Sequence, residues 1–343
     1  VIMEPLLRAV RAALPEWRVT MVARDYAADL LPGDGYDLVS PAYFMNRTPP
    51  PLRPLHRLIP QPVIARAAEC AMALDLGPFE QVINLFLVWE SKLPFESWWT
   101  PEWPIQAGVR HTLDVLADHL QEELGTEIGS ADRLPRLPVF PEAMGWAERC
   151  LPVRGKRLPT ASLVVSADNA LKWWAVPKWA ELNERLVRMG WRTLMVAPHG
   201  HSHARQVFDA CTHKPLWPEM ELRQVAAALA RSDVVVGIDT GPLHMAAALG
   251  TPWVGLFGPT NPFVIGPYDA SIGRPVVAPF ARPPTCKDCW LSFKNRGDRC
   301  PTLTATGCTT LIAVEDVLEA IFALAGGTTL ANPAGPGYAI DDD

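Results

Sequence analysis

The chain has 343 residues, room for about two domains, with 49% hydrophobic and 20% charged side chains. This composition excludes a chain that is disordered as a whole, and no apolar run approaches the roughly 20 residues needed to span a bilayer. The net charge of −6, from 31 basic and 37 acidic side chains, excludes the basic surface of a general nucleic-acid binder.

The first part of the chain alternates between helical and extended patterns. Apolar side chains recur at helical spacing in 4–14, for example. The predicted elements are helices at 4–14, 25–31, 63–74 and 112–124, and strands at 18–23, 36–40 and 81–87. Strands that alternate with helices predict a parallel sheet with helices on both faces.

A second α/β unit follows a stretch at 125–159 that is rich in proline and glycine and has no clear periodicity. The predicted elements are strands at 163–166, 192–197, 234–238 and 254–257, and helices at 178–189, 222–230, 242–249 and 312–324. We therefore expect two Rossmann-like domains facing a cleft, at 1–150 and 151–326. The glycine- and proline-containing tail, 327–343, is predicted to be disordered.

The most informative segment is 232–268, which reads SDVVVGIDTGPLHMAAALGTPWVGLFGPTNPFVIGPY. A strand ends at Asp239-Thr240-Gly241, and a helix follows at once. This places a hydroxyl, a glycine amide and the positive end of a helix dipole together, which indicates an anion site. Thr260 repeats the arrangement after the next strand, and His244 lies within reach of the same corner. The alternative is a tight turn that needs Gly241, with Thr240 as a helix cap.

This segment closely resembles the signature of glycosyltransferase family 9, the bacterial heptosyltransferases that build the inner core of lipopolysaccharide. Weaker similarity covers most of 1–324. It is carried by a lysine-x-tryptophan region at Lys172, Trp174 and Trp179, by a first helix at 6–15, and by 81–85, His111 and Asp114. Ala175 departs from the family, which usually has proline there.

The resemblance implies a GT-B enzyme that transfers a sugar with inversion and without a catalytic metal. An ADP-heptose-like nucleotide sugar would bind the second domain, and an acceptor the first. Carried over by position, Lys172 would contact the donor phosphates, where the leaving group gains charge. Thr240 and Gly241 would hold the diphosphate, and Asp239 would bind sugar hydroxyls. The alternative for Lys172 is a solvated lysine in a strand-to-helix loop.

The start of the chain departs from the family pattern. Family members open with a strand that leads to Gly-Asp, and this aspartate is thought to deprotonate the acceptor. Val1 to Pro5 match the residues that come just after it, so either the first strand and the general base precede Val1, or this member of the family has lost them. Glu4 is a weak substitute, because glutamates are common at helix starts.

A second departure follows the strand at 192–197. Family members commonly have a glutamate there that holds the donor ribose, whereas this chain has three histidines at alternate positions, His199, His201 and His203. The alternatives are a metal site or, as we favour, a different contact from His201 or Ser202 to the nucleotide. The nucleobase is therefore left open.

Four cysteines at Cys286, Cys289, Cys300 and Cys308 form the insert 286–308. The two-residue gap of the first pair lets both thiolates face one ion, so we expect a structural zinc or iron, which the sequence does not separate. Similar inserts occur in some relatives of the family, including protein-modifying heptosyltransferases with bound iron. Unligated thiols or a disulfide are the alternative.

The leading hypothesis is a heptosyltransferase-like enzyme of the cytoplasm that works on a glycan in lipopolysaccharide biosynthesis. The acceptor could instead be a protein or a small molecule, because the proline- and tryptophan-rich loops at 41–103 lie in the expected acceptor domain and look unlike a plain lipid A core site. A non-catalytic nucleotide-sugar-binding scaffold is the third hypothesis. Peripheral membrane association and the oligomeric state are left open.

Overall fold

A computed structural model describes part of the chain. The described residues are 4–16, 19–22, 30, 36–39, 110–151, 158–279, 300 and 307–324. The predicted elements at 63–74 and 81–87, the cysteines Cys286 and Cys289, and the tail 327–343 lie outside them, as does nearly all of the helix predicted at 25–31.

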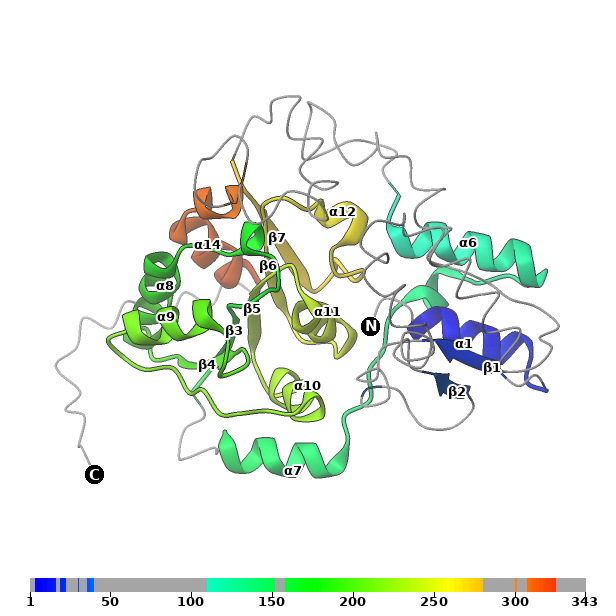
Figure 1. Ribbon diagram of the computed structural model, residues 1–343, viewed down its shortest axis with the longest axis horizontal. Helices are drawn as coiled ribbons and strands as arrows, with labels where there is room; N and C mark the ends of the chain where they lie inside the picture. The colour runs from blue at the N-terminus through cyan, green and yellow to red at the C-terminus, as the bar shows by residue number, and fades with distance from the viewer. Residues whose placement is uncertain are drawn as a thin grey trace, which may run out of the picture.

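Five parallel strands form the central sheet of the described chain (Figure 1). They are β3 (Thr160–Val164), β4 (Arg192–Val196), β5 (Val234–Ile238), β6 (Trp253–Phe257) and β7 (Gly273–Val277). All residues of β3, β5 and β6 are buried, as expected for parallel strands that are covered on both faces. The predicted α/β class is confirmed.

The strand order β4-β3-β5-β6-β7 gives the sheet a topological switch point. From β3 the chain moves outward to β4, then returns across β3 to β5 and continues outward to β7. In open α/β sheets of this kind, ligands bind in the crevice beyond the carboxyl ends of the two strands where the direction reverses. Here these strands are β3 and β5.

Helices cover both faces of the sheet, as Figure 1 shows. The helices α8 (Val176–Arg188), α9 (Ser202–Ala210) and α14 (Val314–Leu324) pack on one face through a shared apolar core. The helices α10 (Leu222–Ala230) and α11 (Gly241–Ala248) pack on the other. In addition, α7 (Pro141–Cys150) lies against α10.

A second group of elements lies on the right of Figure 1. It contains α1 (Glu4–Ala13), the parallel pair β1 (Val19–Val22) and β2 (Tyr36–Val39), α6 (Thr112–Leu124) and the 3-10 turn η3 (Ser130–Arg133). Leu6 of α1 packs against Leu113, Leu116 and Leu120 of α6. The apolar stripes predicted for the two helices therefore face one another.

The two groups meet where α6 approaches the short helix α12 (Pro262–Ile265). His111 caps α6, because its Nδ1 accepts from the Leu113 amide at 3.1 Å. Its Nε2 therefore carries the proton and donates to the Gly266 carbonyl at 2.9 Å. The hydroxyl of Tyr268 donates to Asp114 at 2.7 Å. These contacts join the N-terminal elements to the loops of the central sheet.

Candidate functional site

An ion pair lies at the switch point. Asp239 follows β5 directly, and Lys172 ends η4 (Ala170–Lys172), the 3-10 turn after β3. The Lys172 ammonium donates to Asp239 Oδ2 at 2.7 Å and to its backbone carbonyl at 3.0 Å. These residues are 67 positions apart in the chain, and the parallel arrangement of β3 and β5 brings them together.

The environment of Asp239 keeps its carboxyl ionised. Its side chain is only 5% exposed. Burial by itself raises the pKa of this carboxyl, but the charge of Lys172 and the hydrogen bond from His244 outweigh it and hold the pKa well below its usual range. The Nε2 of His244 lies 3.3 Å from Oδ1, and it must be the donor because a carboxylate only accepts.

The helix α11 starts immediately beyond Asp239. Thr240 precedes the helix in an extended conformation, and Gly241 is its first residue. Gly241 is exposed, and no described atom lies within 4 Å of the position that a Cβ would take. The helix therefore presents its positive end to an accessible space beside the Lys172–Asp239 pair, as an anion site requires.

The turn that carries Lys172 is anchored on both sides. Before it, the Asn169 side chain accepts from the Leu171 amide at 2.8 Å. After it, Trp174 and Trp179 are fully buried, with ring centroids 5.0 Å apart. The Trp174 indole donates to the Ile312 carbonyl at 3.0 Å. These two tryptophans thus belong to the core and hold the position of Lys172.

Thr260 lies in the neighbouring loop, after β6. It is 1% exposed, and its hydroxyl finds no hydrogen-bond partner among the described residues. Next to it, Asn261 caps α12 by accepting from the Phe263 amide at 2.9 Å. A buried hydroxyl without a hydrogen-bond partner is costly in free energy. A hydrogen bond to a bound ligand or water would remove this cost at Thr260.

A histidine ring and a tryptophan ring stack beside Lys172. This stack was not predicted from the sequence. The rings of Trp173 and His203 are 4.5 Å apart and 17° from parallel, and His203 is 5% exposed. Burial, with repulsion from His201, lowers the pKa of His203 to about 4 despite a hydrogen bond to the Trp174 backbone. The ring is therefore neutral at pH 7.

The other two histidines of this loop have different partners. His201 caps α9, and its Nε2 lies 3.3 Å from the Ala167 carbonyl. The Nε2 of His199 contacts the Trp217 carbonyl at 2.8 Å. Within the described ranges, no group of three or more metal-binding side chains comes together, so the histidines do not converge as a metal site would require. The nucleotide contact of His201 stays a prediction.

The structure therefore unites some predicted site residues and separates others. Asp239 is bonded to both Lys172 and His244, and Thr240 and Gly241 adjoin it. Thr260 lies at the end of the next strand. Of the four cysteines, Cys308 is buried at the start of η6 (Cys308–Leu311), and Cys300 is partly buried. The other two lie outside the described residues, so the metal site stays a prediction.

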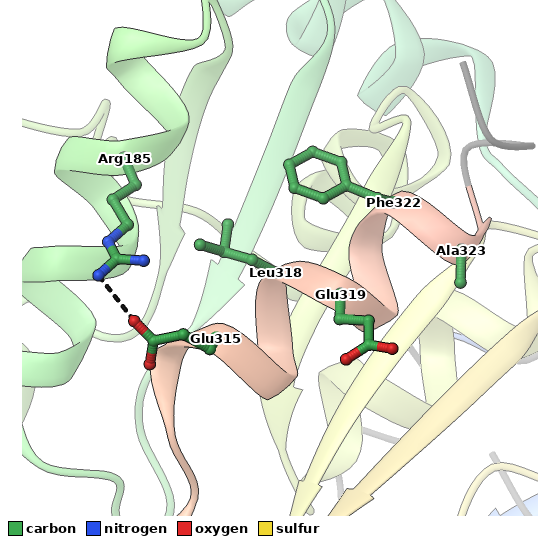
Figure 2. A pocket seen from close by; sticks show the side chains of 6 residues that line it. All are labelled: Arg185, Glu315, Leu318, Glu319, Phe322 and Ala323. Atoms are coloured by element: carbon green, nitrogen blue, oxygen red, sulfur yellow. Dashed lines mark hydrogen bonds and ion pairs between the residues drawn. The ribbon is translucent and has the colours of Figure 1, made fainter. Parts of the chain in front are cut away.

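A shallow hollow of about 550 Å³ lies elsewhere, between α8 and α14 (Figure 2). Its lining residues are Arg185, Glu315, Leu318, Glu319, Phe322 and Ala323. Arg185 is held by Glu315 at 2.8 Å, and a further carboxylate lines the wall. The lining thus has one cation against two carboxylates, so it offers no net positive charge to an anionic ligand.

Comparison with known proteins identifies the family. The sequence profile of glycosyltransferase family 9 (heptosyltransferase) matches residues 113–284, half of the chain. The chain belongs to glycosyltransferase family 9. It is 36% identical over 112 residues to lipopolysaccharide heptosyltransferase 1 of Salmonella typhimurium. That alignment covers 32% of this chain and 35% of the relative, so the chain matches about a third of the length of this curated protein.

Solved structures support the fold over nearly the whole chain. A family 9 glycosyltransferase from Veillonella parvula superposes with a TM-score of 0.62 at 19% identity, covering 95% of this chain and 93% of that one. The ADP-heptose lipopolysaccharide heptosyltransferase II of E. coli gives a TM-score of 0.57 at 17% identity, covering 95% of each chain. The fold is therefore of the GT-B type. Among the described helices, none has the length and apolar character to cross a membrane.

Proposed function

We propose that this family 9 protein is an inverting glycosyltransferase that moves a heptose from ADP-heptose to a glycan acceptor of lipopolysaccharide. The Lys172–Asp239–His244 group at the switch point of the sheet carries this proposal. It lies at the positive end of α11, where a nucleoside diphosphate fits. The names of the relatives support the choice of sugar and acceptor.

In this proposal, the site acts mainly on the leaving group. As the bond between the sugar and the diphosphate breaks, negative charge grows on the phosphate oxygens. Lys172 and the amide end of α11 stabilise that charge without a catalytic metal, because their orientation is fixed before the reaction. Residues 151–326 would hold the donor in this way, and residues 1–150 would hold the acceptor.

Asp239 has a different role in this scheme. A general base needs a pKa near the working pH, whereas the pKa of Asp239 lies far below that. Its two oxygens accept from Lys172 and His244. We therefore assign Asp239 to the orientation of these two side chains and to sugar hydroxyls, and we assign the base to none of the described residues.

Calorimetric titration with ADP, GDP, UDP and ADP-heptose tests the donor site. We expect ADP and ADP-heptose to bind, and Lys172→Ala to weaken binding at least tenfold, about the value of one hydrogen bond between charged groups. Lys214→Ala is the matched control, because this exposed lysine contacts the carbonyls that end α9 and the Phe208 ring, and none of the Lys172–Asp239–His244 group. Equal loss in both variants, or no binding of any nucleotide, would refute the donor site.

A transfer assay tests the acceptor. The protein is incubated with ADP-heptose and a lipopolysaccharide core that lacks heptose, and the mass of the product is measured by mass spectrometry. A mass increase of one heptose, lost in Lys172→Ala, supports the proposal. If ADP-heptose is consumed only when a protein or a small molecule is added, that molecule is the acceptor and the glycan hypothesis is wrong. Nucleotide binding without any transfer would favour the non-catalytic scaffold.

A further inference from the structure

The 3-10 turn η6 packs between the two loops that carry Lys172 and Thr260. On one side, a Cβ on Gly307 would lie 1.7 Å from the Leu171 carbonyl oxygen. On the other, a Cβ on Gly258 would lie 2.0 Å from Oγ1 of Thr309. Both glycines are thus required by close approach, and the three segments are in direct contact.

Thr309 is the centre of this contact. It has no exposed surface, and its hydroxyl donates to the Leu171 carbonyl at 3.3 Å. Leu171 directly precedes Lys172, and Gly258 lies two residues before Thr260. One buried side chain therefore bridges the loop after β3 and the loop after β6, which belong to strands that are not neighbours in the sheet.

We propose that Thr309 is a positioning residue for the donor site, which holds the Lys172 turn and the Thr260 loop at a fixed separation. Removal of its hydroxyl frees the Leu171 carbonyl from its anchor, and the ammonium of Lys172 then loses its alignment with Asp239. The effect on a ligand passes through Lys172, since Thr309 itself is buried away from the accessible space at Gly241. As far as it concerns donor binding, this inference rests on the proposed function.

This assignment also gives a role to the end of the cysteine-containing insert. Cys308 is 8% exposed and packs in the core beneath α14, and Thr309 follows it directly. A change at this end of the insert can therefore be transmitted to the donor site through η6 and its contact with Leu171.

A double-mutant cycle between Thr309→Val and Lys172→Met tests the proposal. Valine keeps the shape of threonine and removes only the hydroxyl. The cycle is measured twice on the full chain: as thermal unfolding midpoints without ligand, and as ADP affinity by calorimetry. Thr309→Ser keeps the hydroxyl and serves as the conservative variant. Gly307→Ala displaces the Leu171 carbonyl independently, with Gly200→Ala, which meets no described atom, as its control.

We expect Thr309→Val to weaken ADP binding about fivefold in the wild-type background and to have almost no effect once Lys172 is methionine. The thermal midpoint should behave likewise, and Thr309→Ser should restore both. Additive midpoint losses would overturn the positioning role, as would an unchanged ADP affinity in a folded Thr309→Val variant. If the wild type binds no nucleotide while the midpoints are non-additive, the proposed donor function fails and the positioning role stands.

Discussion

Replacement of Lys172 by methionine tests the electrostatics of the site without any ligand. Methionine has a similar length but no charge, so among the described side chains the buried carboxylate of Asp239 keeps His244 as its partner. In the wild type, Lys172 offsets the burial that raises the pKa of this carboxyl. In the variant, burial prevails, and the folded protein either holds an uncompensated charge or takes up a proton.

The size of the effect follows from the geometry. Breaking a buried ion pair by removal of one partner costs about 3–5 kcal/mol. The Lys172 side chain is 17% exposed and the contact from His244 remains, so we expect a loss near the lower limit, about 3 kcal/mol at pH 7. The folded wild type has a lowered Asp239 pKa, so its stabilisation is present above the unfolded pKa, about 3.9, and is lost as the pH falls further.

Urea unfolding of both proteins between pH 7 and pH 4 measures this difference. The gap in unfolding free energy should be largest at pH 7 and should shrink towards pH 4, where protonation of Asp239 relieves the variant. Adding Asp239→Asn to Lys172→Met should recover most of the loss, because a neutral amide needs no counter-charge. A gap that is constant with pH, or a double variant that is less stable than Lys172→Met, would refute the reasoning.

Three other substitutions test contacts outside the pair, each by urea unfolding. Tyr268→Phe should lower the free energy of unfolding by about 1.5 kcal/mol, because the hydrogen bond to Asp114 is lost. Burial and that hydrogen bond raise the pKa of Tyr268 to about 12. The stability advantage of the wild type should therefore fall as the pH rises from about 10 to 12. His203→Phe keeps the ring stack. The pKa of His203 is lowered to about 4, so the unfolded chain takes up a proton before the folded protein does. Between pH 7 and pH 4 the free energy of unfolding of the wild type should therefore fall by up to about 3 kcal/mol relative to this variant. Parallel plots of unfolding free energy against pH for the two proteins would contradict this. Gly273→Ala should cost about 1–3 kcal/mol, because its Cβ would lie 1.8 Å from the Trp253 ring; an unchanged midpoint would show that the ring moves aside.

The sequence predicted the parts of the fold whose signal is local. The strand at 234–238 is a continuous apolar run, and the structure confirms its bounds. The helix at 112–124 is confirmed likewise, since its apolar spacing is regular and glycine ends it in a left-handed conformation. The Asp239-Thr240-Gly241 corner is contiguous in the chain, so its place at the end of a strand could be predicted.

The elements that were not predicted include one strand and two longer helices, besides α12 and the 3-10 turns. The strand β7 contains Pro275, which argues against a strand, but β7 lies at the edge of the sheet, where the missing amide costs little. The helix α7 packs on α10 through alanines, Ala143 and Ala147 against Ala227, and small side chains give a weak periodic signal. The helix α9 follows a glycine- and histidine-containing loop and was not predicted.

The site itself was only partly predictable, because its key contacts join distant segments. Only the family resemblance linked Lys172 with Asp239. The stack of His203 on Trp173 and the bridge through Thr309 depend on how loops beyond the carboxyl ends of the strands pack together. A linear sequence holds no periodic signal for either contact. The loops at 41–103, which are predicted to bind the acceptor, and the first cysteine pair lie outside the described residues.

The loop between β6 and β7 shows how the two groups of elements can influence one another. Its beginning, at Gly258, touches Thr309, which also holds the turn before Lys172. Further along it, Gly266 at the end of α12 accepts a hydrogen bond from His111 at the start of α6. Burial lowers the pKa of His111, and the nearby His244 ring lowers it further. Among the described residues, the start of α6 is thus joined to the Lys172–Asp239 pair by two sets of contacts. One runs through Gly266 and the β6–β7 loop to Thr309, and the other through His244, which bonds to Asp239. The β6–β7 loop is therefore one structural connection between the N-terminal elements and the predicted donor site.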